Sequence, residues 1–149
     1  MTLTIDSSRF GRVDIDPATV IEFADGLIGL SGSRYALLAR DQATPFAWLQ
    51  SVEDPRLALP VTNPHLFFAG YEVRLTEEDA QRVGADDRAQ MDVYVTVRAA
   101  ESLADFTANL KAPILIRDGC GWQVINQADG CELRAPLFAG VDVEAAGSP

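Results

Sequence analysis

Few side chains in this sequence could perform chemistry, and their types and spacing favour none. The 149 residues include one histidine, His65, and two cysteines, Cys120 and Cys131. A single histidine cannot build a metal site that needs several imidazoles. A thiol paired with His65 would be a nucleophilic centre, but a histidine directly after Pro64 is more typical of a turn. The sequence therefore predicts a protein that is not an enzyme and that has no metal or cofactor site.

The acidic residues are numerous but scattered. Asp and Glu outnumber Lys and Arg by 22 to 12, which gives a net charge of −10. Such a chain is repelled by a phosphate backbone, so direct nucleic-acid binding is not expected. Opposite potentials speed the encounter with a basic protein, although an acidic surface also simply promotes solubility. The charge indicates either a basic protein partner or solubility alone.

Targeting signals are missing from the sequence. No stretch approaches the roughly 18 apolar residues that a membrane span requires. The first residues lack the basic region and the apolar run of a signal peptide. Two cysteines are too few for a disulfide framework. We therefore expect a cytoplasmic, monomeric protein with reduced thiols and no membrane association.

The elements that must position these side chains are mostly short strands. In the clearest one, residues 91–98, the apolar Met91, Val93, Val95 and Val97 alternate with polar residues, which predicts one buried and one solvated face. Most connections are too short for helical crossovers, so the sheet should be antiparallel. Short helices are expected over 76–84 and 102–106. Further strands are expected over 10–15, 20–23, 35–38, 47–51, 58–61, 71–75, 114–117, 122–126 and 132–135.

The predicted fold is mainly β, a single-domain antiparallel β-barrel-like fold with one or two short helices. Residues 1–140 should form the barrel, and the small, acidic residues 141–149 should form a disordered tail. The Asp129–Gly130 pair is a strong signal for a two-residue hairpin between 122–126 and 132–135. That hairpin would place Cys120 and Cys131 too far apart to form a disulfide.

Four segments combine large apolar residues with turn residues. Residues 23–30 read F-A-D-G-L-I-G-L and residues 46–51 read F-A-W-L-Q-S. An N-P turn at 63–64 precedes F-F-A-G-Y, and N-L-K-A-P-I-L-I at 109–116 precedes W-Q-V-I. Together and in this order they resemble the FliW family of flagellar assembly factors, over nearly the whole chain except the tail. The chain departs from the family pattern at Ile28, often a proline, and at Cys131 and Ala135, where a tyrosine and a histidine are usual.

The resemblance implies a non-enzymatic cytoplasmic binding protein with two partners. One is flagellin, held before export through its terminal helical region. The other is CsrA, a basic RNA-binding dimer that represses translation of the flagellin message. The free protein would remove CsrA from the message by an allosteric route, and accumulated flagellin would occupy the protein and restore repression. A small-ligand-binding or structural β-barrel without a regulatory role is the alternative; ligand binding predicts a concave pocket with perturbed titratable groups.

Nine residues are candidates for the partner-binding surface. Polar, turn and aromatic residues inside apolar segments have no evident packing role, and acidic residues suit a basic CsrA. Asn63 and Asn109 could instead cap turns with their own side chains, and Glu53 and Asp54 could form a solvated turn before Pro55. The candidates are Phe46, Gln50, Asn63, Pro64, Tyr71, Asn109 and Leu110, with Glu53 and Asp54 for CsrA.

Overall fold

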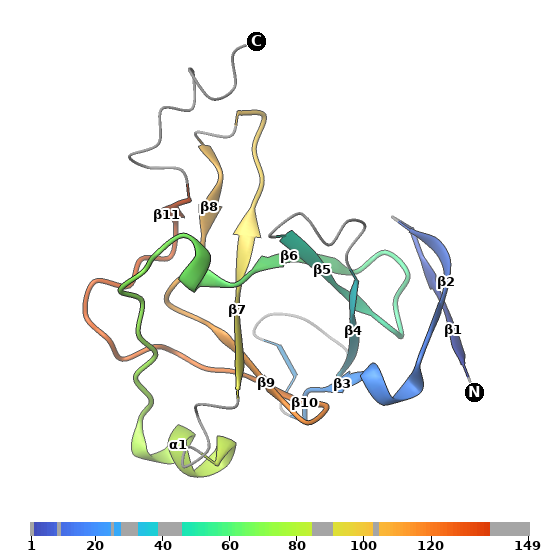
Figure 1. The fold of residues 1–149 in the computed structure, drawn as a ribbon, viewed down its shortest axis with the longest axis horizontal. Coiled ribbons are helices and arrows are strands. Elements are labelled where there is room, and N and C mark those ends of the chain that lie inside the picture. Colours follow the sequence, from blue (N-terminus) through green and yellow to red (C-terminus); the bar gives the residue numbers. More distant parts are fainter. Residues whose placement is uncertain are drawn as a thin grey trace.

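Short strands dominate the structure, a computed structural model that describes residues 2–8, 10–24, 26–27, 33–38, 46–84, 91–102 and 105–137. Figure 1 shows these strands arranged around a central barrel. The strands are β1 (Leu3–Ser7), β2 (Gly11–Ile15), β3 (Ile21–Glu22), β4 (Arg34–Leu38), β5 (Phe46–Ser51), β6 (Ala58–Thr62), β7 (Asp92–Arg98), β8 (Thr107–Ala108), β9 (Ile114–Arg117), β10 (Cys120–Gln123) and β11 (Ala135–Pro136). The helical elements are the 3-10 turns η1 (Pro17–Thr19) and η2 (Pro64–Leu66) and the helix α1 (Glu77–Val83).

Seven strands close into the barrel. They are paired in the order β7-β6-β5-β4-β3-β10-β9, and β9 returns to β7 to complete the ring (Figure 1). All of these pairings are antiparallel except one parallel bridge, between Cys120 of β10 and Glu22 of β3. The expected mainly β, barrel-like fold is confirmed. The predicted boundary of a tail at residue 141 lies outside the described residues.

The barrel interior is filled by apolar side chains. Tyr35 and Phe23 are both fully buried, and their rings meet edge to face at 5.6 Å between centroids. Gly121 in β10 lets the Phe23 ring lie against the strand, because a Cβ at this position would collide with that ring. Such a filled interior is a packed core and does not favour the small-ligand alternative. The buried members are Ile21, Phe23, Leu27, Tyr35, Leu49, Val61, Ile114 and Ile116.

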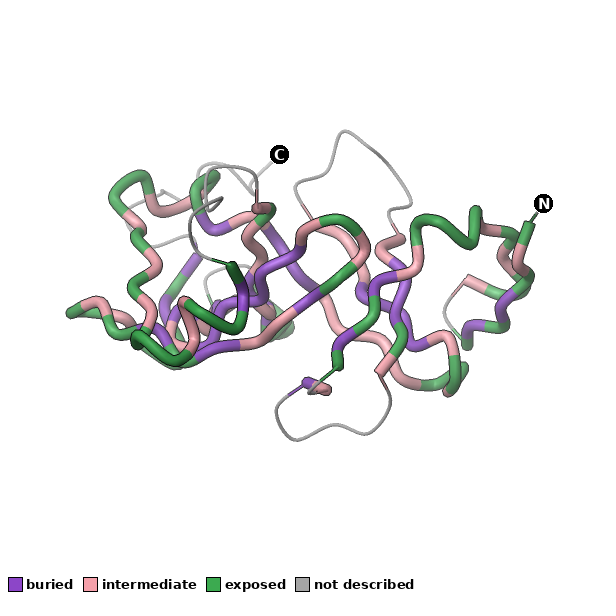
Figure 2. Tube along the Cα trace, turned by 90° about the horizontal axis from the view of Figure 1, so that it is seen from below, coloured by how far each residue is buried: buried purple, intermediate pink, exposed green. Residues whose placement is uncertain are grey.

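Strand β7 follows the prediction only in part: Val95 and Val97 are buried on one face and Asp92 and Arg98 are exposed on the other, but Tyr94 on this second face is half-buried. Tyr94 packs with the cluster inside the barrel, whereas Val95 and Val97 belong to a second buried cluster. Val93 packs against a third cluster that contains Leu115. The alternation therefore separates the barrel interior from an outer layer of packed segments. Figure 2 shows buried stretches running along the barrel strands.

The outer layer has a hairpin at the N-terminus and a short helix. The hairpin β1–β2 docks on the barrel through the backbone, where Ser8 N donates to Pro55 O at 2.8 Å. The helix α1 begins after Thr76, whose hydroxyl accepts from Asp79 N, and it ends at Gly84 with a left-handed φ of 70°. The predicted helix over 76–84 is thus confirmed with both caps. No helix in the described part of the chain is long and apolar enough to cross a membrane.

The predicted hairpin at Asp129–Gly130 is wrong. Strand β10 pairs with β9 through the two-residue turn Asp118–Gly119, where φ is 52° and 79°. The other edge of β10 is taken by β3, so residues 132–135 turn away and Ala135 pairs with Ala108 of β8. Both cysteines are nevertheless free, Cys120 exposed and Cys131 half-buried. Residues 71–75, also predicted as a strand, run extended without forming one.

Candidate functional site

The nine candidate residues fall into two groups. Six of them lie in β5, in residues 63–71 or in residues 109–110, and three of these six, Phe46, Tyr71 and Leu110, belong to or pack against the second buried cluster. The other three, Gln50, Glu53 and Asp54, lie at the end of β5 and in the turn that leads to β6. The structure therefore offers two candidate surfaces instead of one. The six are Phe46, Asn63, Pro64, Tyr71, Asn109 and Leu110.

Residues 71–75 are fixed over the barrel by the buried amide of Asn126. Its Nδ2 donates to Tyr71 Oη at 3.1 Å and to Glu72 O at 2.8 Å. Its Oδ1 accepts from Arg74 N at 2.9 Å and from Ala128 N at 3.0 Å. All hydrogen-bonding positions of this fully buried side chain are therefore in use. Sequence reasoning missed Asn126, because three of its four partners lie more than 50 residues away.

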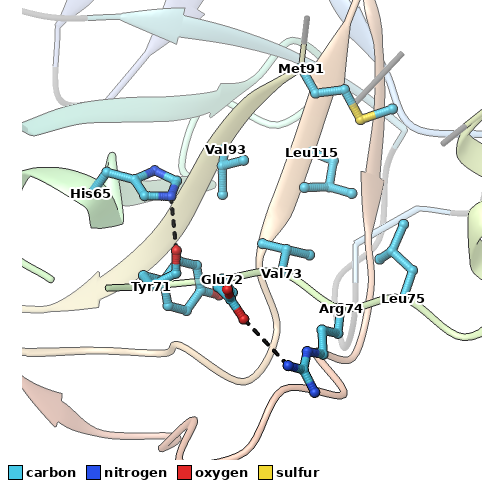
Figure 3. Close-up of a pocket in the computed structure, with 9 residues that line it drawn as sticks. All are labelled: His65, Tyr71, Glu72, Val73, Arg74, Leu75, Met91, Val93 and Leu115. Carbon is cyan, nitrogen blue, oxygen red and sulfur yellow. Dashed lines mark hydrogen bonds and ion pairs between the residues drawn. The ribbon is translucent and has the colours of Figure 1, made fainter. Parts of the chain in front are cut away.

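Two hollows that share Tyr71, Glu72 and Arg74 flank this segment, and we call them together the 71–75 surface. The first has a volume of about 510 Å³ and an apolar floor that includes Val93 and Leu115 (Figure 3). The second has a volume of about 470 Å³. The remaining residues of the first are His65, Val73, Leu75 and Met91, and those of the second are Phe68, Gly70, Leu110, Ala128, Asp129, Gly130 and Cys131.

Of the candidates, only Tyr71 and Leu110 line the 71–75 surface. They are linked, since Tyr71 Oη donates to Leu110 O at 2.8 Å. Sequence reasoning did not select the apolar residues on the floor of the first hollow. Met91 and Val93 belong to an alternating apolar pattern, and such a pattern predicts burial in the core, not a binding site. The first hollow lies between residues 71–75 and the barrel residues Val93 and Leu115. These residues are far apart in the sequence, so no local pattern predicts the hollow.

Asn63 and Asn109 cap turns with their side chains, which the sequence analysis gave as the alternative to partner binding. Asn63 Oδ1 accepts from His65 N at 2.9 Å at the start of η2. Asn109 Oδ1 accepts from Lys111 N at 3.0 Å and from Ala112 N at 3.2 Å. The premise that these polar residues lack a packing role is therefore wrong, because each satisfies backbone donors.

The remaining residues of this group are also packed. Pro64 is buried as the first residue of η2. The ring of Phe46 stacks on Phe67 with 5.8 Å between centroids, and both pack against the second buried cluster. Phe46 and Pro64 therefore have packing roles, which the sequence-based proposal for them did not include.

Gln50 is fully buried, which contradicts the premise for proposing it as a partner contact. Its Oε1 accepts from Ser7 Oγ at 2.7 Å and so ties the N-terminal hairpin to the barrel. Its Nε2 faces four backbone carbonyls of the turn after β5, at 3.1 to 3.3 Å. These contacts give Gln50 a structural role. The carbonyls belong to Ser51, Asp54, Pro55 and Leu57.

Glu53 presents a fixed negative charge beside the same turn. Its Oε1 accepts from Ser33 N at 3.0 Å and from Arg34 N at 3.2 Å. These two backbone donors hold the pKa of the exposed Glu53 carboxyl below its usual value. Asp54 Oδ1 accepts from Arg56 N at 3.0 Å, and Ser51 Oγ accepts from the backbone amides of both acidic residues. The turn before Pro55 is therefore ordered and carries two adjacent carboxylates.

His65 is bound to oxygen atoms. Its Nε2 lies 3.2 Å from Tyr71 O, and its Nδ1 lies 3.2 Å from Asn63 Oδ1. The ring also meets Tyr71 edge to face at 5.8 Å. In the described part of the chain, no group of three or more His, Cys, Asp or Glu side chains could hold a metal ion.

Tyr71 makes the stability of this surface sensitive to alkali. Burial raises the pKa of Tyr71 to about 12, although the hydrogen bond from Asn126 opposes the rise. Because the folded state retains this proton above the unfolded value of 10.0, stability should fall as the pH rises from about 10 to 12. The loss would be about 2.7 kcal/mol for a fully buried phenol, and about 1–2 kcal/mol for this partly exposed ring.

The variant Tyr71→Phe isolates this contribution from those of Tyr35 and Tyr94, whose pKa values burial also raises. Urea unfolding at pH 9 and pH 11.5 should show that the variant loses about 1 kcal/mol less than the parent protein between the two conditions. Equal losses in both proteins would mean that Tyr71 is not protected in the folded state.

Comparison with known proteins covers nearly the whole chain. The sequence profile of the FliW protein family matches residues 4–137. A flagellar assembly factor FliW from Bdellovibrio bacteriovorus is 37% identical over 141 residues, which are 91% of this chain and 79% of that protein. Another from Alkaliphilus metalliredigens is 34% identical over 116 residues, which are 76% of this chain and 72% of that protein.

The fold agrees with this similarity. A crystal structure of the flagellar assembly factor FliW superimposes with a TM-score of 0.82 and 29% sequence identity. The match covers 91% of this chain and 97% of that one. The agreement includes the barrel and the segments packed around it, since little of either chain is left out.

Proposed function

The chain belongs to the FliW family of flagellar assembly factors, and from this membership we propose that it acts in the cytoplasm by binding two proteins, without catalysis. One partner is flagellin awaiting export. The other is the translational repressor CsrA, which the free protein would withdraw from the flagellin message. Accumulated flagellin would occupy the protein and lower its affinity for CsrA, so that flagellin synthesis follows export. Any allosteric loss of RNA from CsrA must be reciprocal, with RNA weakening CsrA binding by the same factor.

The observation that carries this proposal is the apolar hollow of the 71–75 surface. Its floor contains Val93 and Leu115, and Val73, Leu75 and Met91 complete the apolar lining. An amphipathic helix inserts residues spaced three and four apart into such a hollow. The terminal region of flagellin has this character, so we place flagellin here. The contact is mainly apolar and should depend little on salt.

A charge placed in the hollow should block flagellin. Met91 is half-buried at the start of β7, so Met91→Lys keeps a flexible side chain there while adding a cation. We expect flagellin to bind about tenfold more weakly or worse, with a melting temperature close to that of the parent. Binding is measured by calorimetric titration.

Ile125→Lys is the matched control, because Ile125 is 44% exposed and lines neither hollow. It adds the same charge to an exposed apolar site and should leave the flagellin affinity unchanged. Equal weakening by both variants would attribute the effect to net charge and would remove flagellin from the 71–75 surface.

CsrA is placed at the turn with Glu53 and Asp54. Both carboxylates lie side by side on an ordered turn, on a chain of net charge −10. Figure 1 shows this turn, between β5 and β6, on the opposite side of the barrel from the segment leading into α1. A fixed pair of carboxylates complements a basic protein and speeds its encounter. The two partners would therefore use separate surfaces.

Salt and charge removal test this placement together. The double variant Glu53→Gln, Asp54→Asn keeps the oxygen acceptors of the turn and removes both charges. At 50 mM salt it should bind CsrA about tenfold more weakly than the parent, and at 500 mM the difference should shrink. Flagellin binding should change little in either condition.

The control is Glu77→Gln, Glu78→Gln, which removes two exposed charges from α1 instead. It should have only a small effect on CsrA. If the two double variants weaken CsrA equally, only the net charge matters and the turn is not the contact. An equal salt response for flagellin and CsrA would contradict the use of two surfaces with different chemistry.

A further inference from the structure

A third hollow, of about 330 Å³, is lined by side chains that donate hydrogen bonds. Its cations are Arg98 and Arg134, and no acidic side chain lines it. The Oδ1 atom of Asn109 is occupied by two backbone amides, so this amide can offer only its NH₂ group. The remaining lining residues are Thr96, Val97, Thr107 and Leu133. A set of guanidinium, hydroxyl and amide donors is suited to an oxyanion.

The strand pairing fixes this hollow in place. Arg98 of β7 lies beside Thr107 of β8, and the following pair in the ladder is Val97 beside Ala108. Ala108 in turn pairs with Ala135 of β11. Val97, Ala108 and Ala135 are all buried in the second cluster. Because side chains alternate across a strand, the buried row anchors one face and the opposite face carries Arg98 and Thr107.

Arg98 and Arg134 differ from the arginines of this chain that are ion-paired. Arg12, Arg74 and Arg82 form ion pairs with nearby carboxylates. Arg98 and Arg134 form no ion pair with any residue that the structure describes, although acidic residues outnumber basic ones by 22 to 12. Two exposed guanidinium groups therefore line one hollow, and neither has a hydrogen-bond or ion-pair partner among the described residues. Such a pair can bind one carboxylate through several N–H groups.

We propose that this hollow binds an acidic side chain of a protein partner. Leu133, 67% exposed, lies at the same hollow and would contact an apolar residue next to the acidic one. The partner segment would therefore combine glutamate or aspartate with leucine-like neighbours. A polyphosphate chain is disfavoured as the ligand. It would extend past the two arginines, and the net charge of −10 on the protein would repel the rest of its phosphates. The surface is distinct from the two assigned to flagellin and CsrA.

The test uses two acetylated, amidated peptides, Leu-Glu-Glu-Leu and Leu-Gln-Gln-Leu, followed by amide NMR shifts of the full chain at low salt. The glutamate peptide should shift residues 96–98, 107–109 and 133–134. The glutamine peptide should bind about tenfold more weakly or not at all. The double variant Arg98→Gln, Arg134→Gln should bind the glutamate peptide about tenfold more weakly than the parent protein does. Its melting temperature should be unchanged, because both side chains are exposed.

Arg56→Gln, at an exposed arginine outside this hollow, is the control and should bind the peptide like the parent. Inorganic phosphate is titrated in parallel, because a free phosphate is the alternative to a peptide carboxylate as the anion bound in this hollow. Equal binding of the two peptides, or full binding by the double variant, would overturn the proposal. Phosphate that binds at the same residues more tightly than the glutamate peptide would overturn the assignment to a peptide carboxylate.

Discussion

Replacing Asn126 by alanine should lower the free energy of unfolding by about 3–4 kcal/mol and weaken flagellin binding at least tenfold. The side chain is fully buried and holds Glu72 O, Arg74 N, Ala128 N and the Tyr71 hydroxyl. Alanine leaves several of these groups without a partner, at about 1–3 kcal/mol each where they remain buried. Relaxation of residues 71–75 reduces the total, but it also distorts the first hollow, where we place flagellin.

Urea unfolding and calorimetric titration with flagellin measure the two effects separately. The control is Gln127→Ala, because Gln127 is exposed and its side chain bonds only to the nearby Ile125 O. That variant should stay within about 0.5 kcal/mol of the parent. A change below about 1 kcal/mol for Asn126→Ala would show that water replaces these hydrogen bonds. Unchanged flagellin affinity in a destabilised variant would separate residues 71–75 from the binding site.

Replacing Gln50 by alanine should cost about 3 kcal/mol of stability and leave the affinities for flagellin and CsrA unchanged in the folded protein. The amide of Gln50 serves four carbonyls of the turn after β5 and accepts the Ser7 hydroxyl. Alanine removes the side-chain hydrogen bond between Ser7 of the β1–β2 hairpin and the barrel, and leaves a cavity. Partner affinity should persist because the buried side chain cannot reach a partner surface.

Stability is measured by urea unfolding, and affinity is measured well below the unfolding midpoint. Gln81→Ala, on the exposed side of α1, should change stability by no more than about 0.5 kcal/mol. A tenfold loss of affinity with normal stability in Gln50→Ala would restore the sequence-based assignment of Gln50 to the partner surface. That outcome would require the turn to open in the complex.

Local signals predicted the elements that depend on local chemistry. Thr76 and Gly84 delimit α1 through a hydroxyl cap and a left-handed residue, and both are visible in the sequence. The strand at 114–117 was predicted with its observed bounds, because it is a continuous apolar run after a proline. The two-residue strand β8 (Thr107–Ala108) was not predicted, because it carries too little pattern.

Long-range pairing explains the main failures. Asp118–Gly119 and Asp129–Gly130 are equally good turn signals, and only closure of the barrel decides that the first makes the hairpin while the second does not. The alternation in β7 was recognised, but Tyr94 on its predicted solvated face packs inside the barrel, and Val95 and Val97 on the other face are buried in a second cluster outside it. Sequence reasoning could not separate the barrel interior from this outer layer.

The candidate site was only partly predictable for the same reason. Tyr71 and Leu110 were selected, and both line the 71–75 surface. Asn126 was not selected, because three of its four partners lie more than 50 residues away, and Gln50 was assigned to the surface although most of its partners lie in the turn directly after it. A buried amide has the same sequence signature as an exposed one, so polarity alone could not assign these residues.

Calorimetric titration of the purified chain with flagellin, and separately with CsrA, measures directly whether it is a binding protein with two partners. We expect both titrations to saturate, each with a dissociation constant of about 1 µM or lower. CsrA binding should weaken between 50 and 500 mM salt while flagellin binding changes little. Titrations that stay flat for both proteins at concentrations of about 50 µM would contradict the proposed function.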